Sequence, residues 1–128
     1  MIYIDSSVAL ASVLTEARQP PEGLWTKRLF SSRLLEYEVW NRIFAKGIAD
    51  THRGEIEAML RKIDLVELSR DCLRRALRPY PVAVRTLDGL HLATMAYLRE
   101  QGEGVELASY DNRLLAAAEA LGIPCAAL

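Results

Sequence analysis

The stretch MIYIDSSVAL, residues 1–10, predicts the first unit of the fold. Its β-branched and aromatic run, MIYI, indicates a short buried strand that ends at Asp5. Ser6 or Ser7 can then cap a helix over the next residues, VALASVL. A strand that passes almost directly into a helix, with a carboxylate at the junction, begins a β-α unit.

The same alternation of strand and helix continues along the chain. We expect further strands over residues 28–32, 64–69, 105–109 and 123–128. Helices are expected over residues 33–49, 53–63, 70–77, 85–100 and 112–121, with Asp50 or Thr51 and Thr86 as caps and Gly122 just past the last end. Strands that alternate with helices favour a parallel sheet covered on both faces. The sequence therefore predicts one three-layer α/β domain over residues 1–128, with four to five mostly parallel strands in an order that it does not fix.

The composition is that of an ordinary globular domain. The chain has 128 residues, of which 51% are hydrophobic and 26% charged, and this length suits one domain. Its formal net charge of −1 removes the simplest argument for a nucleic-acid partner, a strongly basic balance, but permits a local basic patch. Two cysteines, Cys72 and Cys125, are too few for a disulfide framework and are expected to be buried free thiols.

The first apolar segment has no basic residues before it and is interrupted by Asp5, so we do not expect a secretory signal peptide. No segment reaches the roughly 20 apolar residues of a membrane span. The sequence therefore predicts no membrane association, and the expected location is the cytoplasm.

Three acidic residues lie where an α/β sheet forms sites. Asp5 follows the first strand and Asp111 follows the strand at 105–109, while Asp88 lies in the first turn of the almost wholly apolar helix RTLDGLHLATMAYLRE, residues 85–100. Ligands of open α/β sheets bind at the carboxyl ends of the strands, where the strand order reverses. We therefore expect Asp5 and Asp111 to meet at one edge of the sheet, and the position of Asp88 is compatible with that edge.

Each acid also has a purely structural explanation. Asp88 would complement its helix dipole, which is worth roughly 0.3–1 kcal/mol, and Asp111 or Asp5 could cap a helix. Clustering favours a site, because two carboxylates about 4 Å apart repel by roughly 4 kcal/mol at an effective dielectric near 20. Such a cluster either holds protons or binds a cation, and oxygen ligands suit Mg²⁺ or Mn²⁺. A cation of this kind polarises phosphoryl oxygens and activates water.

Four stretches of the chain together resemble one known family, the PIN-domain ribonucleases, and within it the VapC-type toxins of bacterial and archaeal toxin–antitoxin pairs. The stretches are YIDSSVAL (3–10), SSRLLEYEVWNR (31–42), RTLDGLHLATMA (85–96) and LASYDNRLLAAAEALGI (107–123). The resemblance implies a PIN-like fold and an acidic quartet around one or two Mg²⁺ ions, with Mn²⁺ as a substitute. Carried over by motif, the catalytic and metal-binding residues are Asp5, Glu38, Asp88 and Asp111.

Glu36 is an alternative to Glu38 as the second acid of the quartet. Helical periodicity does not decide between Glu36 and Glu38, because both have apolar neighbours. The family pattern places the acid before an aliphatic residue and three positions before a small polar one. Val39 and Asn41 give Glu38 that environment, while Glu36 would lie on a solvated helix face.

The resemblance further implies the activity and its partners. The expected function is a Mg²⁺-dependent endoribonuclease that acts as a toxin, with RNA as substrate, a VapB-like antitoxin as partner, and a homodimer as the assembly. The alternative is a catalytically inactive PIN-fold module that binds RNA or protein. Expected substrate-binding residues are Ser6, Asn41, Ser109 and Arg113. Arg42, Lys46 and Arg85 lie near proposed acids in the sequence and are candidates for phosphate contact; each alone is better explained as solvated surface, but together they predict a mixed patch.

The remaining polar and aromatic residues have structural interpretations. His91 lies one turn after Asp88 and is expected to be packed or hydrogen-bonded rather than a ligand, and His52 is expected to be exposed. The bulky residues near the second helix should mostly belong to the core: Trp25, Tyr37, Trp40 and Phe44.

Two other phosphate-processing classes are disfavoured. A response-regulator receiver needs a lysine near its last strands. The only lysines of this chain are Lys27, Lys46 and Lys62, all in its first half. A haloacid-type phosphatase needs a second Asp two residues after the first, where this chain has Ser7.

Overall fold

The computed structural model describes residues 1–14 and 16–128, and its centre is a parallel sheet of four strands in the order β3-β2-β1-β4. The strands are β1 (Ile2–Ile4), β2 (Leu29–Ser32), β3 (Asp64–Val66) and β4 (Glu106–Ala108). All three strand pairs are parallel, which confirms the predicted α/β class. The strand expected over residues 123–128 is wrong, since only a single bridge joins Cys125 to Leu107. Pro124 has no amide hydrogen with which to extend that pairing.

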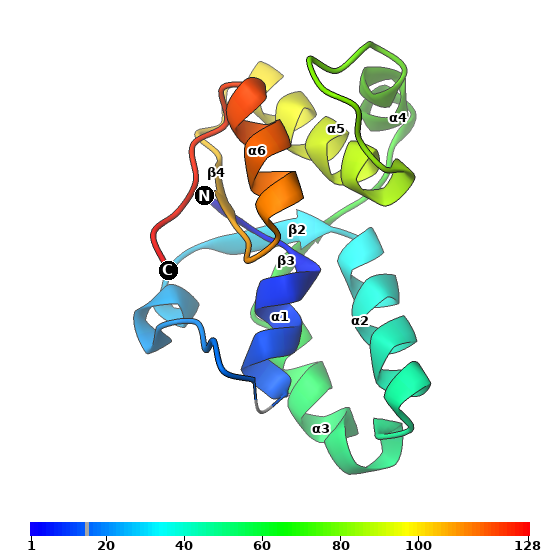
Figure 1. The fold of residues 1–128 in the computed structure, drawn as a ribbon, viewed down its shortest axis with the longest axis vertical. Coiled ribbons are helices and arrows are strands. Elements are labelled where there is room, and N and C mark those ends of the chain that lie inside the picture. The colour runs from blue at the N-terminus through cyan, green and yellow to red at the C-terminus, as the bar shows by residue number, and fades with distance from the viewer. Residues whose placement is uncertain (15) are drawn as a thin grey trace.

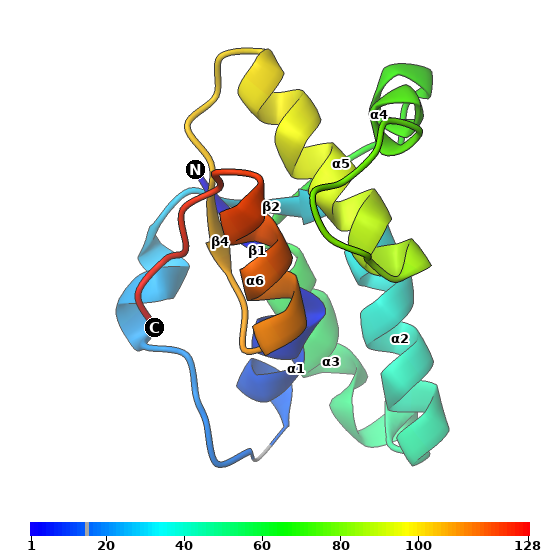
Figure 2. The same ribbon diagram turned by 45° about the horizontal axis from the view of Figure 1, so that its top comes forward.

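Helices cover both faces of the sheet, as predicted. One face carries α1 (Ser6–Val13), α2 (Leu34–Lys46) and α3 (Ala49–Leu60), and the other carries α5 (Thr86–Glu100) and α6 (Asn112–Ala120). The short helix α4 (Arg70–Ala76) packs against α5. Figures 1 and 2 show the sheet between these two layers.

The alternation of β1 explains the two cores. Ile2 and Ile4 pack into the cluster that α1, α2 and α3 form, whereas Tyr3 packs into the cluster beneath α5 and α6. Successive side chains of a strand point to opposite faces, so a strand of only three residues contributes to both layers. Tyr3 is paired with Phe30 on one side and with Leu107 on the other.

Several predicted helix ends differ from the observed ones. Helix α1 is capped by Asp5, not by Ser6 or Ser7, because a carboxylate oxygen accepts amide hydrogens as well as a hydroxyl does. Helix α3 begins at Ala49, and α5 begins after Arg85, both without a side-chain cap. A 3₁₀ helix, η1 (Glu22–Thr26), lies between α1 and β2, where no helix was predicted.

The predicted burial of the bulky residues on α2 is wrong at two positions. Leu35, Val39 and Ile43 are buried, but Tyr37 and Phe44 are each 60% exposed. Because a helix turns about 100° per residue, a helix that buries the first set presents the second to solvent. Trp25 and Trp40 are half-buried and pack against the edge of the core. His52 was expected to be exposed but is half-buried.

The thiols also differ from the prediction. Both cysteines are free, as predicted, and Cys72 is buried, but Cys125 is exposed.

Within the described residues, no helix combines the length and apolar character that crossing a membrane requires.

The strand order indicates at which edge of the sheet a site can form. The chain goes from β1 to β2 and β3 on one side and returns to β4 on the other side of β1. The strand order therefore reverses between β1 and β4, and the carboxyl ends of these two strands lie beside each other. The amide of Asp5 donates to the carbonyl of Ala108 across this junction, at 3.1 Å.

Candidate active site

Asp5 is fixed at the end of β1 by three donors. Its Oδ2 accepts from Ser7 Oγ at 2.7 Å, from Ser109 Oγ at 2.8 Å and from the Ser7 amide at 3.3 Å. Asp5 is almost fully buried, so these bonds replace the water that the carboxylate loses. All three use the same oxygen, and among the described residues Oδ1 has no hydrogen-bond partner in the protein.

Asp111 is fixed at the start of α6 in the same manner. Its Oδ1 accepts from the amides of Arg113, at 2.9 Å, and Leu114, at 3.4 Å. The Asp111 amide in turn donates to Ser109 Oγ at 2.9 Å. Ser109 thus links the two acids directly, since its hydroxyl donates to Asp5 and accepts from Asp111. Asp111 caps its helix, as its structural explanation required, and in the described part of the chain its Oδ2 has no hydrogen-bond partner.

Glu38 reaches the site from α2. Its Oε1 is hydrogen-bonded to Nε2 of His91, which lies on α5. The Glu38 side chain is 17% exposed and His91 is buried. Glu36, the competing acid, lies elsewhere, beside Trp40 and Arg53 in a separate depression. Of the two acids, Glu38 is the one that the structure brings to Asp5 and Asp111.

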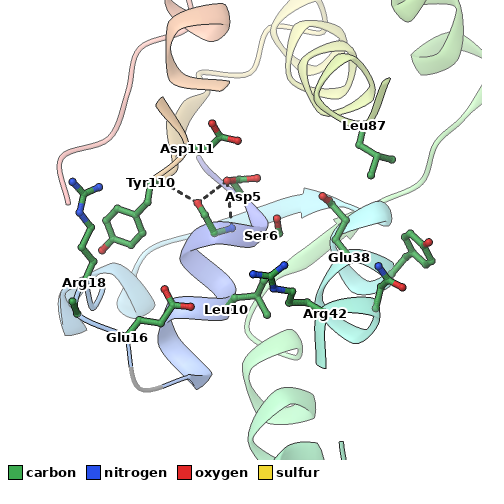
Figure 3. Close-up of a pocket in the computed structure, with 14 residues that line it drawn as sticks. Asp5, Ser6, Leu10, Glu16, Arg18, Glu38, Arg42, Leu87, Tyr110 and Asp111 are labelled. Atoms are coloured by element: carbon green, nitrogen blue, oxygen red, sulfur yellow. Dashed lines mark hydrogen bonds between the residues drawn. The ribbon is translucent and has the colours of Figure 1, made fainter. Parts of the chain in front are cut away.

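These three carboxylates enter one open pocket of about 710 Å³ from β1, α2 and the start of α6 (Figure 3). Ser6 and Asn41, both expected to bind substrate, also line it, together with Arg42 and Arg18. The lining holds four acidic side chains, Glu16 included, and two basic ones. The pocket therefore carries net negative charge, which opposes a polyanionic ligand unless a cation is added.

Asp88 lies at the same edge of the sheet but lines a smaller pocket of about 340 Å³ with Arg85 and Arg113. Burial raises the pKa of Asp88 above its ordinary value, and the negative charges of Asp111, Asp5 and Glu38 raise it further, while His91 opposes them. The other three acids are thus close enough to Asp88 to disfavour its negative charge.

The tight cluster that the sequence predicted is nevertheless not preformed. Among the described residues, no group of three or more Asp, Glu, His or Cys side chains is arranged closely enough to hold a metal ion. The donor chemistry does fit a hard divalent cation. Within residues 1–14 and 16–128, Asp5, Glu38 and Asp111 each have one oxygen held by the protein and one without such a bond. Mg²⁺ retains several waters and needs few direct carboxylate ligands.

The other predicted contacts are distributed around this edge. Ser109 is nearly buried and supports Asp5, so its hydroxyl does not face the pocket as a substrate contact would. Arg113 and Arg85 flank Asp88, and Lys46 is exposed in the last turn of α2. His91 is buried and hydrogen-bonded, as predicted.

Two residues of the site were missed by the sequence interpretation. Tyr3 was expected only as part of a buried strand, yet its hydroxyl lies 2.6 Å from His91 Nδ1. Burial raises the pKa of Tyr3 well above its ordinary value. Arg18, from the segment between α1 and η1, lies over the ring of Tyr110 at the pocket's edge, with 5.4 Å between its guanidinium carbon and the ring centroid. The alternation of β1 could have shown that Tyr3 faces a different layer from Ile2 and Ile4; the sequence holds no comparable signal for Arg18.

Comparison with known proteins adds independent information. The PIN domain family matches residues 2–120 of the chain. Ribonuclease VapC46 of Mycobacterium tuberculosis strain H37Rv is 33% identical over 131 residues, which cover 95% of this chain and 93% of that protein. Ribonuclease VapC35 of the same species, in strains CDC 1551 and H37Rv, is 29% identical over 129 residues, covering 96% of this chain and 93% of the relative.

Proposed function

The chain belongs to the PIN-domain family, and from this premise we propose that it is a metal-dependent endoribonuclease, the toxin of a toxin–antitoxin pair. The relatives named above are ribonucleases of VapC type, and the matches run over nearly the whole chain. The proposed reaction is hydrolysis of an RNA phosphodiester bond by water.

The observation that carries this proposal is the arrangement of Asp5, Glu38 and Asp111. Each carboxylate is anchored through one oxygen, by Ser7 and Ser109, by His91, and by backbone amides respectively. Their other oxygens are left for a ligand of an open, negatively charged pocket. Such a constellation suits Mg²⁺, with Mn²⁺ as a substitute, and we expect Asp88 to complete the set.

A bound divalent cation would supply Lewis-acid stabilisation of the phosphate and lower the pKa of a water molecule. The protein's own groups prepare the reaction. Ser7 and Ser109 keep Asp5 in place, and the unbonded oxygens of Glu38 and Asp111 can accept a proton of the attacking water. Arg42 and Arg18 line the same pocket and offer guanidinium groups to the RNA backbone. Ser6 and Asn41 can hydrogen-bond the substrate there.

The family also gives the expected partners. We propose a VapB-like antitoxin that binds this chain, a homodimer as the assembly, and the cytoplasm as the location. The rings of Tyr37 and Phe44 on α2 are exposed, and that of Tyr37 lines the pocket.

The test is RNA cleavage by the unaltered protein and by Asp5→Asn, in Mg²⁺ and in EDTA. Asparagine is as good a helix cap as aspartate, so the variant should fold. We expect it to reduce cleavage to background because a charged ligand oxygen is lost. The control is Asp71→Asn, an exposed acid on α4, which should cleave normally. Equal cleavage by Asp5→Asn and the unaltered protein would refute the role of Asp5.

A second function has one observation in its favour: over residues 1–14 and 16–128, no metal-binding group is preformed. The chain would then be an inactive PIN-fold module that binds RNA or protein. Thermal unfolding in Mn²⁺ and in EDTA separates the two functions. Binding to the folded state alone, at about 100 times the dissociation constant, adds roughly 2.7 kcal/mol to the free energy of unfolding. An unchanged melting temperature at millimolar Mn²⁺ would favour the inactive module.

A further inference from the structure

A buried chain of hydrogen bonds links the sheet to Glu38. The backbone amide of Ser32, at the end of β2, donates to the hydroxyl oxygen of Tyr3 at 3.1 Å. That oxygen lies 2.6 Å from Nδ1 of His91, whose Nε2 is hydrogen-bonded to Glu38. Tyr3 is 0% exposed and His91 1%, so water cannot replace either link.

The direction of each bond follows from its donors. An amide can only donate, so Ser32 occupies a lone pair of the Tyr3 oxygen, and we infer that the phenolic hydrogen is donated to Nδ1 of His91. Nδ1 then accepts, and Nε2 carries a hydrogen. That hydrogen points at the Glu38 carboxylate. Every donor in the chain thus meets an acceptor.

We propose that Tyr3 and His91 are positioning residues, which together hold the Glu38 carboxylate in the orientation that binds the cation. This inference rests on the proposed function. An imidazole ring bonded at both nitrogens has a fixed orientation and a fixed tautomer. Because His91 takes up Oε1, the other oxygen of Glu38 is the one presented to the pocket.

The architecture explains why this task falls to these residues. Glu38 lies on α2 and His91 on α5, which cover opposite faces of the sheet. Neither helix alone fixes the distance between them at the site. Tyr3 belongs to the central strand and reaches the layer of α5, so it sets the imidazole against the sheet from which Asp5 also comes.

A purely structural role makes a different prediction. Tyr3 also packs edge-on against Phe30, with ring centroids 5.3 Å apart. If Tyr3 only filled space, Tyr3→Phe would leave the site as it is, since it retains the ring and removes one hydroxyl. The variant therefore separates positioning from packing.

The first test needs neither metal nor RNA. Nitrogen-15 chemical shifts of the imidazole report the hydrogen bonds of its two nitrogens, and in the unaltered, metal-free protein we expect His91 to donate from Nε2 and to accept at Nδ1. In Tyr3→Phe the Nδ1 shift should change, because Nδ1 loses its donor. Imidazole shifts that are the same in Tyr3→Phe and in the unaltered protein would overturn the proposal.

The second test measures the dissociation constant of Mn²⁺ by calorimetry. Loss of a residue that orients a metal ligand typically weakens metal affinity by about 10–100-fold, and we expect this of Tyr3→Phe. The matched control is Tyr80→Phe, which also removes a phenolic hydroxyl that is hydrogen-bonded to α5. In the described residues that hydroxyl donates to the Gly89 carbonyl and not to His91. Tyr80→Phe should bind Mn²⁺ as the unaltered protein does.

A double variant completes the test. In a Glu38→Gln background the charged carboxylate is gone, so adding Tyr3→Phe should change Mn²⁺ affinity no further. Equal affinity of Tyr3→Phe and the unaltered protein, or equal weakening by Tyr80→Phe, would refute the positioning role while the proposed function stands. Absence of Mn²⁺ binding by the unaltered protein would refute the proposed function, and the positioning role with it.

Discussion

The surroundings of Asp88 disfavour the negative charge of its carboxylate. A carboxylate in the first turn of a helix is normally stabilised by the helix dipole, yet burial and the charges of Asp111, Asp5 and Glu38 raise the pKa of Asp88 above its ordinary 3.8. These unfavourable effects therefore exceed the favourable one. In the metal-free protein, ionised Asp88 makes folding less favourable than a neutral residue in its place would.

We predict that Asp88→Asn raises the melting temperature of the metal-free protein at pH 7. A carboxyl whose pKa is raised by folding contributes stability below its unfolded pKa and loses that contribution as the pH rises through the folded pKa. The advantage of the neutral variant should therefore shrink as the pH is lowered toward 4. Calorimetry in EDTA between pH 4 and pH 8 measures it.

Asp71→Asn is the control, because Asp71 is exposed in the first turn of α4 and its replacement should lower stability slightly through the dipole. Saturating Mn²⁺ should reverse the order for Asp88, so that the unaltered protein becomes the more stable. A lower melting temperature of Asp88→Asn in EDTA would contradict the repulsion inferred here.

Single residues also show where sequence interpretation ends. Asp5, Asp88 and Asp111 could be placed because each lies next to a predicted strand or helix end, which the local pattern reveals. Tyr3 could not, since its partner His91 is 88 residues away and a strand residue of its type is ordinarily core.

At the scale of elements, two exposed glycines give opposite predictions for the same substitution. Gly47 ends α2 in the left-handed region, with φ of 68°, and Gly54 lies inside α3. A Cβ at either position would meet no atom within 4 Å, so only backbone conformation matters. Gly47→Ala should lower the free energy of unfolding by about 1–2 kcal/mol, and Gly54→Ala should raise it by about 0.5–1 kcal/mol.

Urea unfolding of the two variants measures these changes as midpoint shifts of opposite sign at unchanged slope. Each variant serves as the control for the other, because neither glycine touches the site. A shift in the same direction for both would show that packing, and not backbone conformation, governs these positions.

Elements were predictable to the extent that local physics sets them. The stripe of Leu35, Val39 and Ile43 fixes the buried face of α2, as predicted. The helix was predicted to run to residue 49, but it ends at Lys46, where Gly47 follows. The start of α3 was misplaced because Ile48 and Ala49 carry no capping signal. The strand predicted over residues 123–128 does not form, because the apolar run beside Pro124 has the composition of a strand but only a single bridge to β4.

At the scale of the whole molecule, strand order was the missing information. Alternation of strands and helices predicted a parallel sheet, but nothing local places β4 beside β1 instead of beside β3. That neighbourhood brings Asp111 to Asp5 and makes the pocket. Strand order follows from how the two apolar layers pack on the sheet, which is a property of the folded chain.

The surface of the folded chain leads to a prediction about assembly. Three large apolar side chains are exposed on α4 and the segment that joins it to α5: Leu73, Leu77 and Val82, of which Leu77 is 85% exposed. Apolar surface that gathers in one place typically marks a protein contact. Of a second apolar group, Tyr37 and Phe44 on α2, Tyr37 lines the pocket, where a homodimer contact would obstruct the proposed RNA substrate. We therefore predict that the proposed homodimer contact lies on the α4 surface.

We predict that the unaltered chain sediments with twice the mass of a single chain at micromolar concentration. Leu77→Glu should sediment as a monomer, because a charge would be buried without a partner at the contact. Phe44→Glu adds the same charge at another exposed apolar residue and should remain dimeric. An unaltered chain that is monomeric at every concentration would contradict the proposed homodimer. Dissociation by Phe44→Glu and not by Leu77→Glu would show that the dimer contact lies on α2 instead.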